Sequence, residues 1–226
     1  MTTIPVIDGR EIPHEIRLQE ILSKLAELAP GASLILIAPH DPNKLLRKLL
    51  TDLPGRLNWG PVEKGPDVWR WQFTGRDAEA PRTVSDYLGW DHRRLEELMA
   101  AGMAAASAGD WQSASELFAE HRTGLTHHAD IEDALLFPAY DGATGNMPNG
   151  PTQLMVEEHR GVRNGLADVA AAVKACNMDE LTDAHLRLSD LLAEHHAQEE
   201  EILFPTMDET FPPEQLSQVI EKLLVA

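Results

Sequence analysis

The sequence is poor in cysteine, in basic residues and in aromatic residues. A single cysteine, Cys176, among 226 residues excludes an internal disulfide framework and any four-cysteine zinc or iron–sulfur site within one chain. The 19 lysines and arginines stand against 37 aspartates and glutamates, which gives a net charge of −18. Because phosphate contacts need clustered basic residues, this balance argues against a nucleic-acid partner. An anionic membrane surface would also repel the chain.

Long hydrophobic runs are missing as well. No apolar run approaches the roughly 18 residues of a membrane-spanning helix. The first residues, MTTIPVIDGREIP, lack a basic region followed by an apolar stretch. We therefore expect a soluble cytoplasmic protein. Since 43% of the residues are hydrophobic, the chain can build a packed core, and its length fits one or two domains.

Charge and local texture divide the chain in two. Residues 1–80 hold 10 basic and 11 acidic residues, whereas the rest of the chain holds 9 and 26. Short apolar runs and turn residues fill the first part, and long helical segments fill the second. These differences predict one domain over 1–76, a polar linker over 77–83 and a second domain over 84–226.

The N-terminal part alternates strand and helix signals. Pro30-Gly31 is a helix stop and Asp41-Pro42 is a helix start. Residues 33–38 form a continuous apolar run, typical of a strand buried on both faces. The order predicts a two-layer α+β sandwich, β-α-β-α-β-β, with two helices on one sheet face. Strands are expected near 4–7, 33–38, 57–63 and 67–74, and helices near 14–28 and 43–53.

Two histidines of this part, His14 and His40, each follow a strand and precede a helix. If the two strands are parallel neighbours, both side chains lie at the sheet edge where α/β folds usually bind ligands. They could then hold a second metal, a haem or an anion, or engage a protein partner. Alternatively, each satisfies backbone groups at the start of its helix.

Four short segments strengthen this reading of the N-terminal part: IDGREIP (7–13), HDP (40–42), EKGP (63–66) and WRW (69–71). Together with the order of elements, they resemble an uncharacterised bacterial domain with the fold of the TusA-like sulfur carriers. Sulfur carriers use a Cys-Pro pair after the first strand. Here the pair is Ile12-Pro13, which has no thiolate to carry a persulfide, so sulfur transfer is not expected.

The C-terminal part repeats itself at one constant offset, the interval from His128 to His195. HADIEDALLFP (128–138) aligns without gaps with HHAQEEEILFP (195–205), and DHR (91–93) aligns with EHR (158–160) at the same offset. Long helical segments near 83–108, 111–139, 151–176 and 179–208, with a shorter fifth from about Pro213, predict an all-α up-down four-helix bundle.

Each copy of the repeat carries two histidines and one glutamate at matching positions. The set is His92, His128 and Glu132 in the first copy and His159, His195 and Glu199 in the second. Residues four apart lie on one helix face, so each histidine–glutamate pair can point at one locus in the bundle core. Core histidines that merely hydrogen-bond to one another are the structural alternative. The recurrence of both carboxylates favours a metal site.

A pair of metal ions would remove the cost of burying four imidazoles and two carboxylates. Each carboxylate can bridge the two ions, and each histidine can terminate one of them. Nitrogen and oxygen ligands without sulfur suit iron or manganese, and zinc is possible. With a bridging oxide or hydroxide, an octahedral iron would keep one open position for a small ligand.

These motifs resemble the hemerythrin-like, or His-His-Glu (HHE), cation-binding domain over about residues 83–210. The resemblance implies two non-haem iron ions, oxo- or hydroxo-bridged, held by those six residues. We expect a protein that binds or reduces a small oxidant such as dioxygen, nitric oxide or peroxide, in a response to oxidative or nitrosative stress. An iron- or gas-sensing or iron-handling module that signals through the N-terminal domain without turnover is the alternative.

One position departs from the oxygen-carrying hemerythrins, which place a further histidine four residues after the one on the third helix. That position is Arg163 here. The symmetrical four-histidine set looks more like the proteins that repair iron centres after nitric oxide or peroxide damage. Those proteins carry a cysteine-bearing N-terminal domain, which is absent here.

Other polar residues near the predicted site are given lesser roles. His127 and His196 adjoin the predicted ligands but turn about 100° away, towards solvent or beside the site. His121 could line an access channel, although a plain core or surface role is favoured. Glu96 is the best candidate for an extra carboxylate ligand. His185 is expected to be exposed. The remaining acidic residues are expected to form a solvated face.

Overall fold

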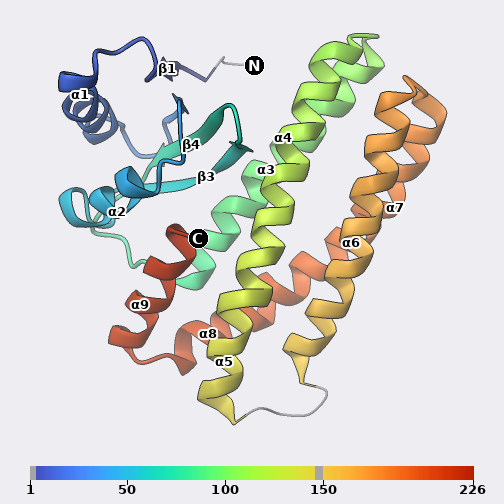
Figure 1. Cartoon of the computed structure of the whole chain (residues 1–226). Coiled ribbons are helices and arrows are strands. Elements are labelled where there is room, and N and C mark those ends of the chain that lie inside the picture. The colour runs from blue at the N-terminus through green and yellow to red at the C-terminus, as the bar shows by residue number, and fades with distance from the viewer. Residues whose placement is uncertain (1–3, 146–149) are drawn as a thin grey trace. The chain divides into compact units, whose positions relative to one another are not determined.

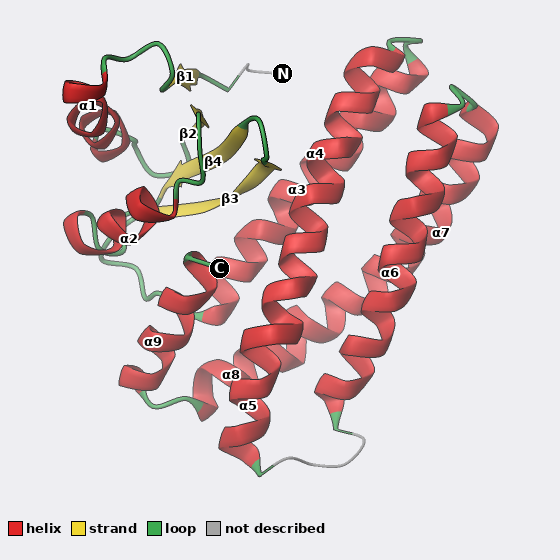
Figure 2. Ribbon diagram, in the orientation of Figure 1, coloured by secondary structure: helices red, strands yellow, loops and turns green. Residues whose placement is uncertain are grey.

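The computed structural model describes residues 4–145 and 150–226. It divides into two compact units: one contains the residues up to Arg82 together with Ile220–Ala226, and the other contains Thr83–Val219. The N-terminal unit combines a sheet with helices and the second is helical (Figures 1 and 2), which confirms the predicted fold class. Within the described residues, no helix has the length and apolar character needed to cross a membrane.

The N-terminal unit follows the predicted order β-α-β-α-β-β. Its elements are β1 (Val6–Asp8), α1 (His14–Ala26), β2 (Ser33–Ala38), α2 (Asn43–Asp52), β3 (Leu57–Lys64) and β4 (Trp69–Gly75). The strand order in the sheet is β1-β2-β4-β3. β1 and β2 are parallel, with Val6 opposite Ile35, and the other neighbours are antiparallel.

The strand β2 is buried on one face. Leu34, Leu36 and Ala38 are buried, whereas the alternate residues Ile35 and Ile37 are only partly buried. The expectation of a strand buried on both faces is therefore wrong. The reason is that α1 and α2 both lie on the same side of the sheet (Figure 1), so only one set of side chains enters the layer between helices and sheet.

The last residues of the chain belong to the N-terminal unit. The indole nitrogen of Trp59 on β3 donates a hydrogen bond of 2.6 Å to the carbonyl oxygen of Leu224. Leu223 and Leu224 are buried in the same unit. The compact units are thus not two consecutive pieces of chain. The division of the sequence into domains at 1–76 and 84–226, joined by a linker at 77–83, therefore stays a prediction.

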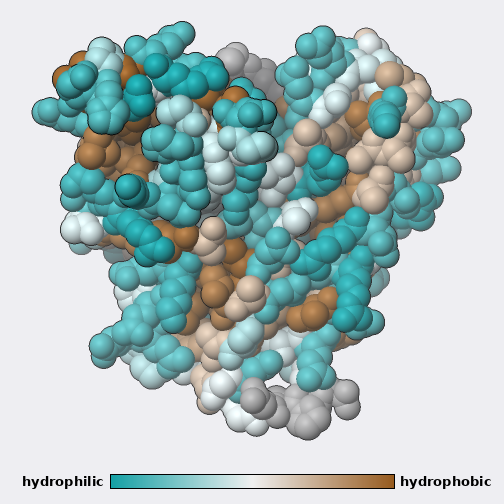
Figure 3. All heavy atoms as spheres, in the orientation of Figure 1, coloured by the Kyte–Doolittle hydropathy of each residue, from teal (hydrophilic) through white to brown (hydrophobic). Residues whose placement is uncertain are grey.

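The helical unit consists of two antiparallel helical hairpins and shorter segments. Its elements are α3 (Val84–Ser107), α4 (Trp111–Ile131), η1 (Glu132–Leu136), α5 (Phe137–Thr144), α6 (Pro151–Lys174), α7 (Met178–Gln198), η2 (Glu199–Leu203), α8 (Phe204–Thr210) and α9 (Pro213–Leu224), whose last residues belong to the N-terminal unit. The elements η1 and η2 are single π-helical turns, which divide two of the predicted long helices. Hydrophilic residues form much of the visible surface (Figure 3), as the acidic excess requires.

The offset of the sequence repeat also relates the ends of the helices. Within each of the pairs α3 and α6, α4 and α7, η1 and η2, both the first and the last residues are separated by this offset. The N-caps of α4 and α7 follow the same rule, because Asp110 accepts from the amide of Ser113 and Asn177 accepts from the amide of Glu180. The repeat is therefore a repeat of structure as well as of motifs.

The repeat also includes a left-handed backbone conformation just after the first helix of each hairpin. Gly109, after α3, has a φ of 79°, and Cys176, after α6, has a φ of 51°. In both copies the next amide bonds back to the helix, from Asp110 to Ala105 and from Asn177 to Ala172. This closing turn requires the left-handed region that glycine enters most easily.

We predict that Cys176→Gly raises the free energy of unfolding by about 1 kcal/mol, because it removes the penalty of a side chain in the left-handed region. Cys176→Ala is the matched control, since it removes the thiol but keeps Cβ. Urea unfolding of the full-length protein measures both changes. Equal stability of the two variants would contradict the explanation.

Candidate metal centre

The six predicted side chains meet in the interior of the helical unit, each at most 3% exposed. Each long helix contributes one histidine, and each π-helical turn begins with one glutamate. They are His92 on α3, His128 on α4, Glu132 at the start of η1, His159 on α6, His195 on α7 and Glu199 at the start of η2. All of the residues selected from the sequence therefore come together.

The four imidazoles form two pairs. The Nε2 atoms of His92 and His128 are 3.0 Å apart, and those of His159 and His195 are 3.1 Å apart. Each pair comes from one helical hairpin, α3 with α4 or α6 with α7. Each hairpin thus directs two ring nitrogens at one point.

The two glutamates lie between these pairs. Glu132 Oε2 is 3.5 Å from Nε2 of His128 and 3.3 Å from Nε2 of His159, so it faces one imidazole of each pair. Glu199 faces the other two imidazoles in the same way, at 3.4 and 3.2 Å. Each carboxylate is placed to bridge two positions.

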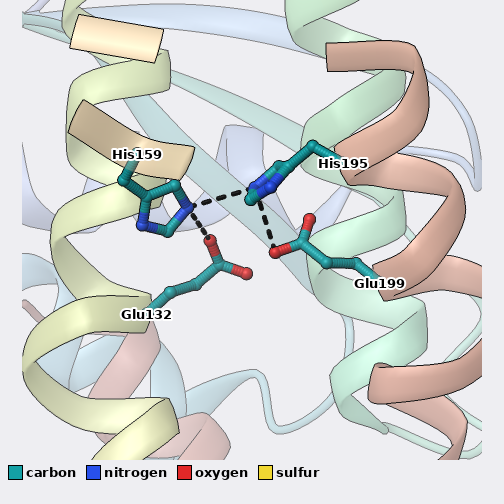
Figure 4. Close-up of side chains that lie close together, drawn as sticks. All are labelled: Glu132, His159, His195 and Glu199. Atoms are coloured by element: carbon teal, nitrogen blue, oxygen red, sulfur yellow. Dashed lines mark hydrogen bonds and ion pairs between the residues drawn. The ribbon is translucent and has the colours of Figure 1, made fainter. Parts of the chain in front are cut away.

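Ligand atoms of these residues form two adjoining groups within which all atoms lie within 4.8 Å of one another. One group is Glu132, His159, His195 and Glu199 (Figure 4), and the other is His92, His128 and Glu199. Glu199 belongs to both groups. Two neighbouring cation positions that share a carboxylate fit this arrangement.

The hydrogen bonding of the two buried glutamates shows whether metal ions would fit between the imidazoles. Both carboxylate oxygens of Glu132 and of Glu199 are buried and have no hydrogen-bond partner among the described residues. Burying an ionised carboxylate without a partner costs several kcal/mol. The inward imidazole nitrogens and the carboxylate oxygens are the donor atoms that iron, manganese and zinc accept. The residues present therefore fit a pair of such ions.

A second set of carboxylates holds each histidine from behind. Each Nδ1 lies within hydrogen-bonding distance of an aspartate or glutamate. The contacts join His92 to Glu200 (2.7 Å), His128 to Asp91 (3.0 Å), His159 to Asp133 (2.7 Å) and His195 to Glu158 (2.8 Å). Since an ionised carboxylate only accepts, Nδ1 is the donor, and in the neutral imidazole Nε2 presents its lone pair to the centre.

The outer carboxylates were not given a role from the sequence. They also obey the repeat offset, Asp91 matching Glu158 and Asp133 matching Glu200. Each adjoins a predicted ligand in the chain. Aspartate replaces glutamate between the copies, which keeps the charge while changing the length. An acidic residue at the same position of both copies, next to a predicted ligand, is the sequence pattern that identifies these outer carboxylates.

One outer carboxylate is itself held by an arginine. Arg94 donates from Nε to Asp91 at 2.8 Å, and both side chains are buried. Burial alone would raise the pKa of Asp91, but the charge of Arg94 and the contact with His128 hold it below its ordinary value. Asp91 is therefore ionised when it holds the imidazole of His128.

The buried carboxylates favour positive charge in the site. When no metal ion is bound, protons on the histidines provide that charge. Burial alone would lower the pKa of His195, but the adjoining Glu199 and Glu158 raise it to about 9. Burial also opposes protonation of His128, yet Glu132 and Asp91 raise its pKa well above the ordinary value. A metal ion must displace such protons, as metal binding to histidine requires.

The π-helical turns place the glutamates. The amide of Phe137 bonds to the carbonyl of Glu132 and that of Phe204 to the carbonyl of Glu199, five residues back in each case. Pro138 follows Phe137, and a proline has no amide to donate and excludes the carbonyl four residues before it. A widened turn accommodates that break, and such turns are frequent at functional sites.

Among the other histidines of the helical unit, only His185 departs from its predicted position. His121, His127 and His196 are buried, and His185 is half-buried rather than exposed. The ring of His196 stacks on that of His92, with centroids 3.7 Å apart, so it lies beside the site rather than in solvent.

The candidate extra ligand, Glu96, does not join either group of ligand atoms. Its side chain is 66% exposed and lies 3.7 Å from Nδ1 of His196.

His14 and His40 line one cleft of the N-terminal unit, with a volume of about 520 Å³. The cleft lies where the parallel strands β1 and β2 end and α1 and α2 begin. The two histidines thus share the sheet edge expected from the sequence. Asp41 and Lys44 also line this cleft, so charges of both signs face it.

Comparison with known proteins agrees with this geometry. The chain belongs to the hemerythrin HHE cation binding domain family, whose model matches residues 83–206 and, in a second match, 150–223. The starts of the two matches, at 83 and 150, are separated by the repeat offset. The helical unit is therefore a cation-binding module of a family that typically binds iron.

Residues 6–75 match a family described as "Uncharacterized conserved protein (DUF2249)", which confirms the expected uncharacterised domain. Among curated proteins, the chain is 26% identical over 135 residues to a protein named DNA nickase from Nostoc sp. (strain PCC 7120 / SAG 25.82 / UTEX 2576). The match covers 60% of this chain and 36% of that protein. No solved structure matches the chain.

We predict that Glu158→Gln weakens metal binding by about 10- to 100-fold, because His195 loses the charged partner that fixes its tautomer. The matched control is Glu157→Gln, which changes the neighbouring surface glutamate that pairs with Arg160. Chelator competition on both variants measures the affinity. Equal affinities would show that the outer carboxylate does not support the metal.

We also predict that His121→Leu protects the protein against acid. Burial, with the charges of Arg94 and His185, lowers the pKa of His121 to about 4. The unfolded histidine titrates near 6.5, so protons favour the unfolded chain and stability falls as the pH drops from 6.5 towards 4. Leucine is chosen because Leu188 occupies the position that corresponds to His121 in the second copy of the repeat.

At pH 5 this histidine reduces the free energy of unfolding by about 2 kcal/mol relative to neutral pH, and the variant should lack that loss. Urea unfolding of the metal-free protein at pH 7.5 and pH 5 compares the two. The same pH dependence in both proteins would argue against a buried neutral imidazole.

Proposed function

We propose that the helical unit holds two non-haem iron ions and binds or reduces a small oxidant, namely dioxygen, nitric oxide or peroxide. The observation that carries the proposal is the pair of buried glutamates without hydrogen-bond partners among the described residues, set between two pairs of imidazoles. An activity of this kind would serve a response to oxidative or nitrosative stress.

The residues we assign as ligands are the four histidines and two glutamates of the buried cluster. Two histidines and two shared carboxylates give each ion four protein ligands. An ion that prefers six ligands keeps positions for smaller groups, so a small molecule can bind directly. Manganese or zinc would use the same donor atoms, and family membership favours iron.

Bound iron would supply exchange of electrons with the oxidant. The protein's own residues do the rest. The outer carboxylates keep the proton of each imidazole on Nδ1, and so keep Nε2 available. Burial of the six side chains excludes bulk water, which strengthens the electrostatic interactions inside the site.

The likeness to a protein named DNA nickase does not lead us to propose an activity on DNA. That match covers only 36% of the relative. Of the charge of −18, nearly all lies after residue 80, where 26 acidic residues face 9 basic ones. Such a surface repels phosphates. We propose that the chain acts without nucleic acid and without a membrane partner.

A sensing role without turnover is the second candidate. The cleft of about 520 Å³ beside His14 and His40 favours it, because it offers the N-terminal unit a place for a second ligand or a protein partner. The state of the iron site would then be read out as a change in what this unit binds.

We expect about two iron ions per chain in the purified protein, and loss of metal in His128→Ala and in Glu199→Ala. His185→Ala is the control, because that histidine belongs to neither ligand group. Elemental analysis and visible absorption measure the result. One zinc ion without visible absorption, or full metal retention in both variants, would refute the assignment.

Mixing the reduced protein with dioxygen, nitric oxide or peroxide in a stopped-flow spectrometer separates the two candidates. Continued consumption of the oxidant indicates an enzyme. A stable adduct, together with altered hydrogen exchange in the N-terminal unit, indicates a sensor.

A further inference from the structure

The helical unit contains a groove that the metal centre does not use. It has a volume of about 450 Å³ and runs between α3, α4 and α7, reaching η2. Apolar side chains form most of its wall, chiefly Leu95, Met99, Met103, Leu125 and Leu192. Volumes of about 300–1,000 Å³ with mostly apolar walls are typical of sites for small organic molecules.

Three histidines interrupt this apolar wall: His121, His185 and His196. His121 is 1% exposed and His196 is 9% exposed. Nδ1 of His121 and Nε2 of His196 have no hydrogen-bond partner among the described residues. Two histidines of the groove wall therefore each carry a buried ring nitrogen whose hydrogen-bonding capacity no described residue uses, which is unfavourable for a buried polar group.

The groove adjoins the candidate metal centre without containing it. The ring of His196 stacks on that of His92, with an angle of 14° between the planes. Glu200, which holds Nδ1 of His92, also lines the groove. A molecule in the groove would thus be separated from His92 by a single side chain.

The repeat shows that the fold does not require these histidines. At the repeat offset, His121 corresponds to Leu188 and His196 to Ala129. The other copy in each case builds the same helix with an apolar residue at that place. The two histidines are a departure from the repeat, and they occur together on one groove.

The polar rim differs between the copies as well. Glu96, at the groove, corresponds to Arg163, whose guanidinium binds Asp130 at 2.8 Å and Asp133 at 3.0 Å. In the second copy this arginine therefore pairs with the outer carboxylate Asp133. In the first copy, Glu96 and Glu200 line an open groove.

We propose that this groove is a binding site for a neutral, largely apolar organic molecule about the size of a substituted aromatic ring, with one hydrogen-bonding group for an imidazole of the groove wall. The volume far exceeds that of a diatomic gas. The carboxylates of Glu96, Glu200 and Glu201 at the groove oppose an anion. The site goes beyond the proposed reaction with a small oxidant and does not depend on which metal is bound.

The test uses benzyl alcohol and benzoate as a neutral and an anionic probe of equal ring size. Both are titrated into the full-length, zinc-loaded protein carrying ¹³C-methyl methionine. Met99 and Met103 line the groove, and Met155 and Met207, which do not line it, serve as internal references. We expect benzyl alcohol to shift the first two signals saturably and benzoate to bind at least tenfold more weakly.

Substitutions then separate binding in the groove from binding elsewhere. Ala100→Phe fills the groove from α3, and Ala193→Phe fills it from α7. Ala167→Phe is the matched control, since it is the repeat-related exposed alanine on α6. We expect at least a tenfold loss of benzyl alcohol binding in whichever groove variant keeps the wild-type circular dichroism, and no loss in the control.

Three results would overturn the proposal. They are the absence of saturable shifts at Met99 and Met103, equal binding of benzoate, and unchanged binding in a folded groove variant. None of these results depends on iron, so failure here is distinguishable from failure of the proposed oxidant chemistry.

Discussion

Two buried glutamates set between four imidazoles are the constraint on which the helical unit depends. Glu132 and Glu199 are fully buried, and each faces two imidazole nitrogens at 3.2–3.5 Å. In a bundle without bound cations, such carboxylates would be better replaced by apolar side chains. Because positive charge must sit between them, the site and the stability of the bundle are coupled, and the helices are organised to deliver histidines to that point.

The duplication gives this site its order. His128 and His195 are held by Asp91 and Glu158, each from within its own copy of the repeat. The other two contacts cross between the copies, from His92 to Glu200 and from His159 to Asp133. Each glutamate likewise faces one imidazole from each hairpin. Neither hairpin can complete a metal position alone, so the site joins the two halves of the bundle.

The sequence was sufficient for the class of fold and for the six side chains of the cluster, because helical spacing and a second copy constrain both. It was not sufficient for contacts made between distant segments. Glu200 lies in an acidic run that is typical of a solvated face, yet it bonds to His92 on another helix. The contact between Trp59 and Leu224 joins residues from distant parts of the chain, and no local pattern announces it. The sequence pattern predicts ordinary helix through the π-helical turns. The local sign of a widened turn is a proline, and a proline also fits the start of a new helix.

Comparing the two copies of the repeat distinguishes the residues that both copies share from the residues that differ between them. Helix ends, the N-caps of α4 and α7, the four imidazoles and both sets of carboxylates recur at the same offset, so they belong to the framework that the two copies share. Arg163 does not recur, and it stands at the position where the oxygen-carrying hemerythrins place a further histidine. Here its guanidinium pairs with Asp130 and with Asp133, the outer carboxylate of His159. The corresponding residue of the first copy is Glu96, which lines the groove and lies 3.7 Å from Nδ1 of His196. The two copies are therefore alike in the innermost side chains of the cluster and differ in the charged side chain placed outside it, a glutamate in the first copy and an arginine in the second.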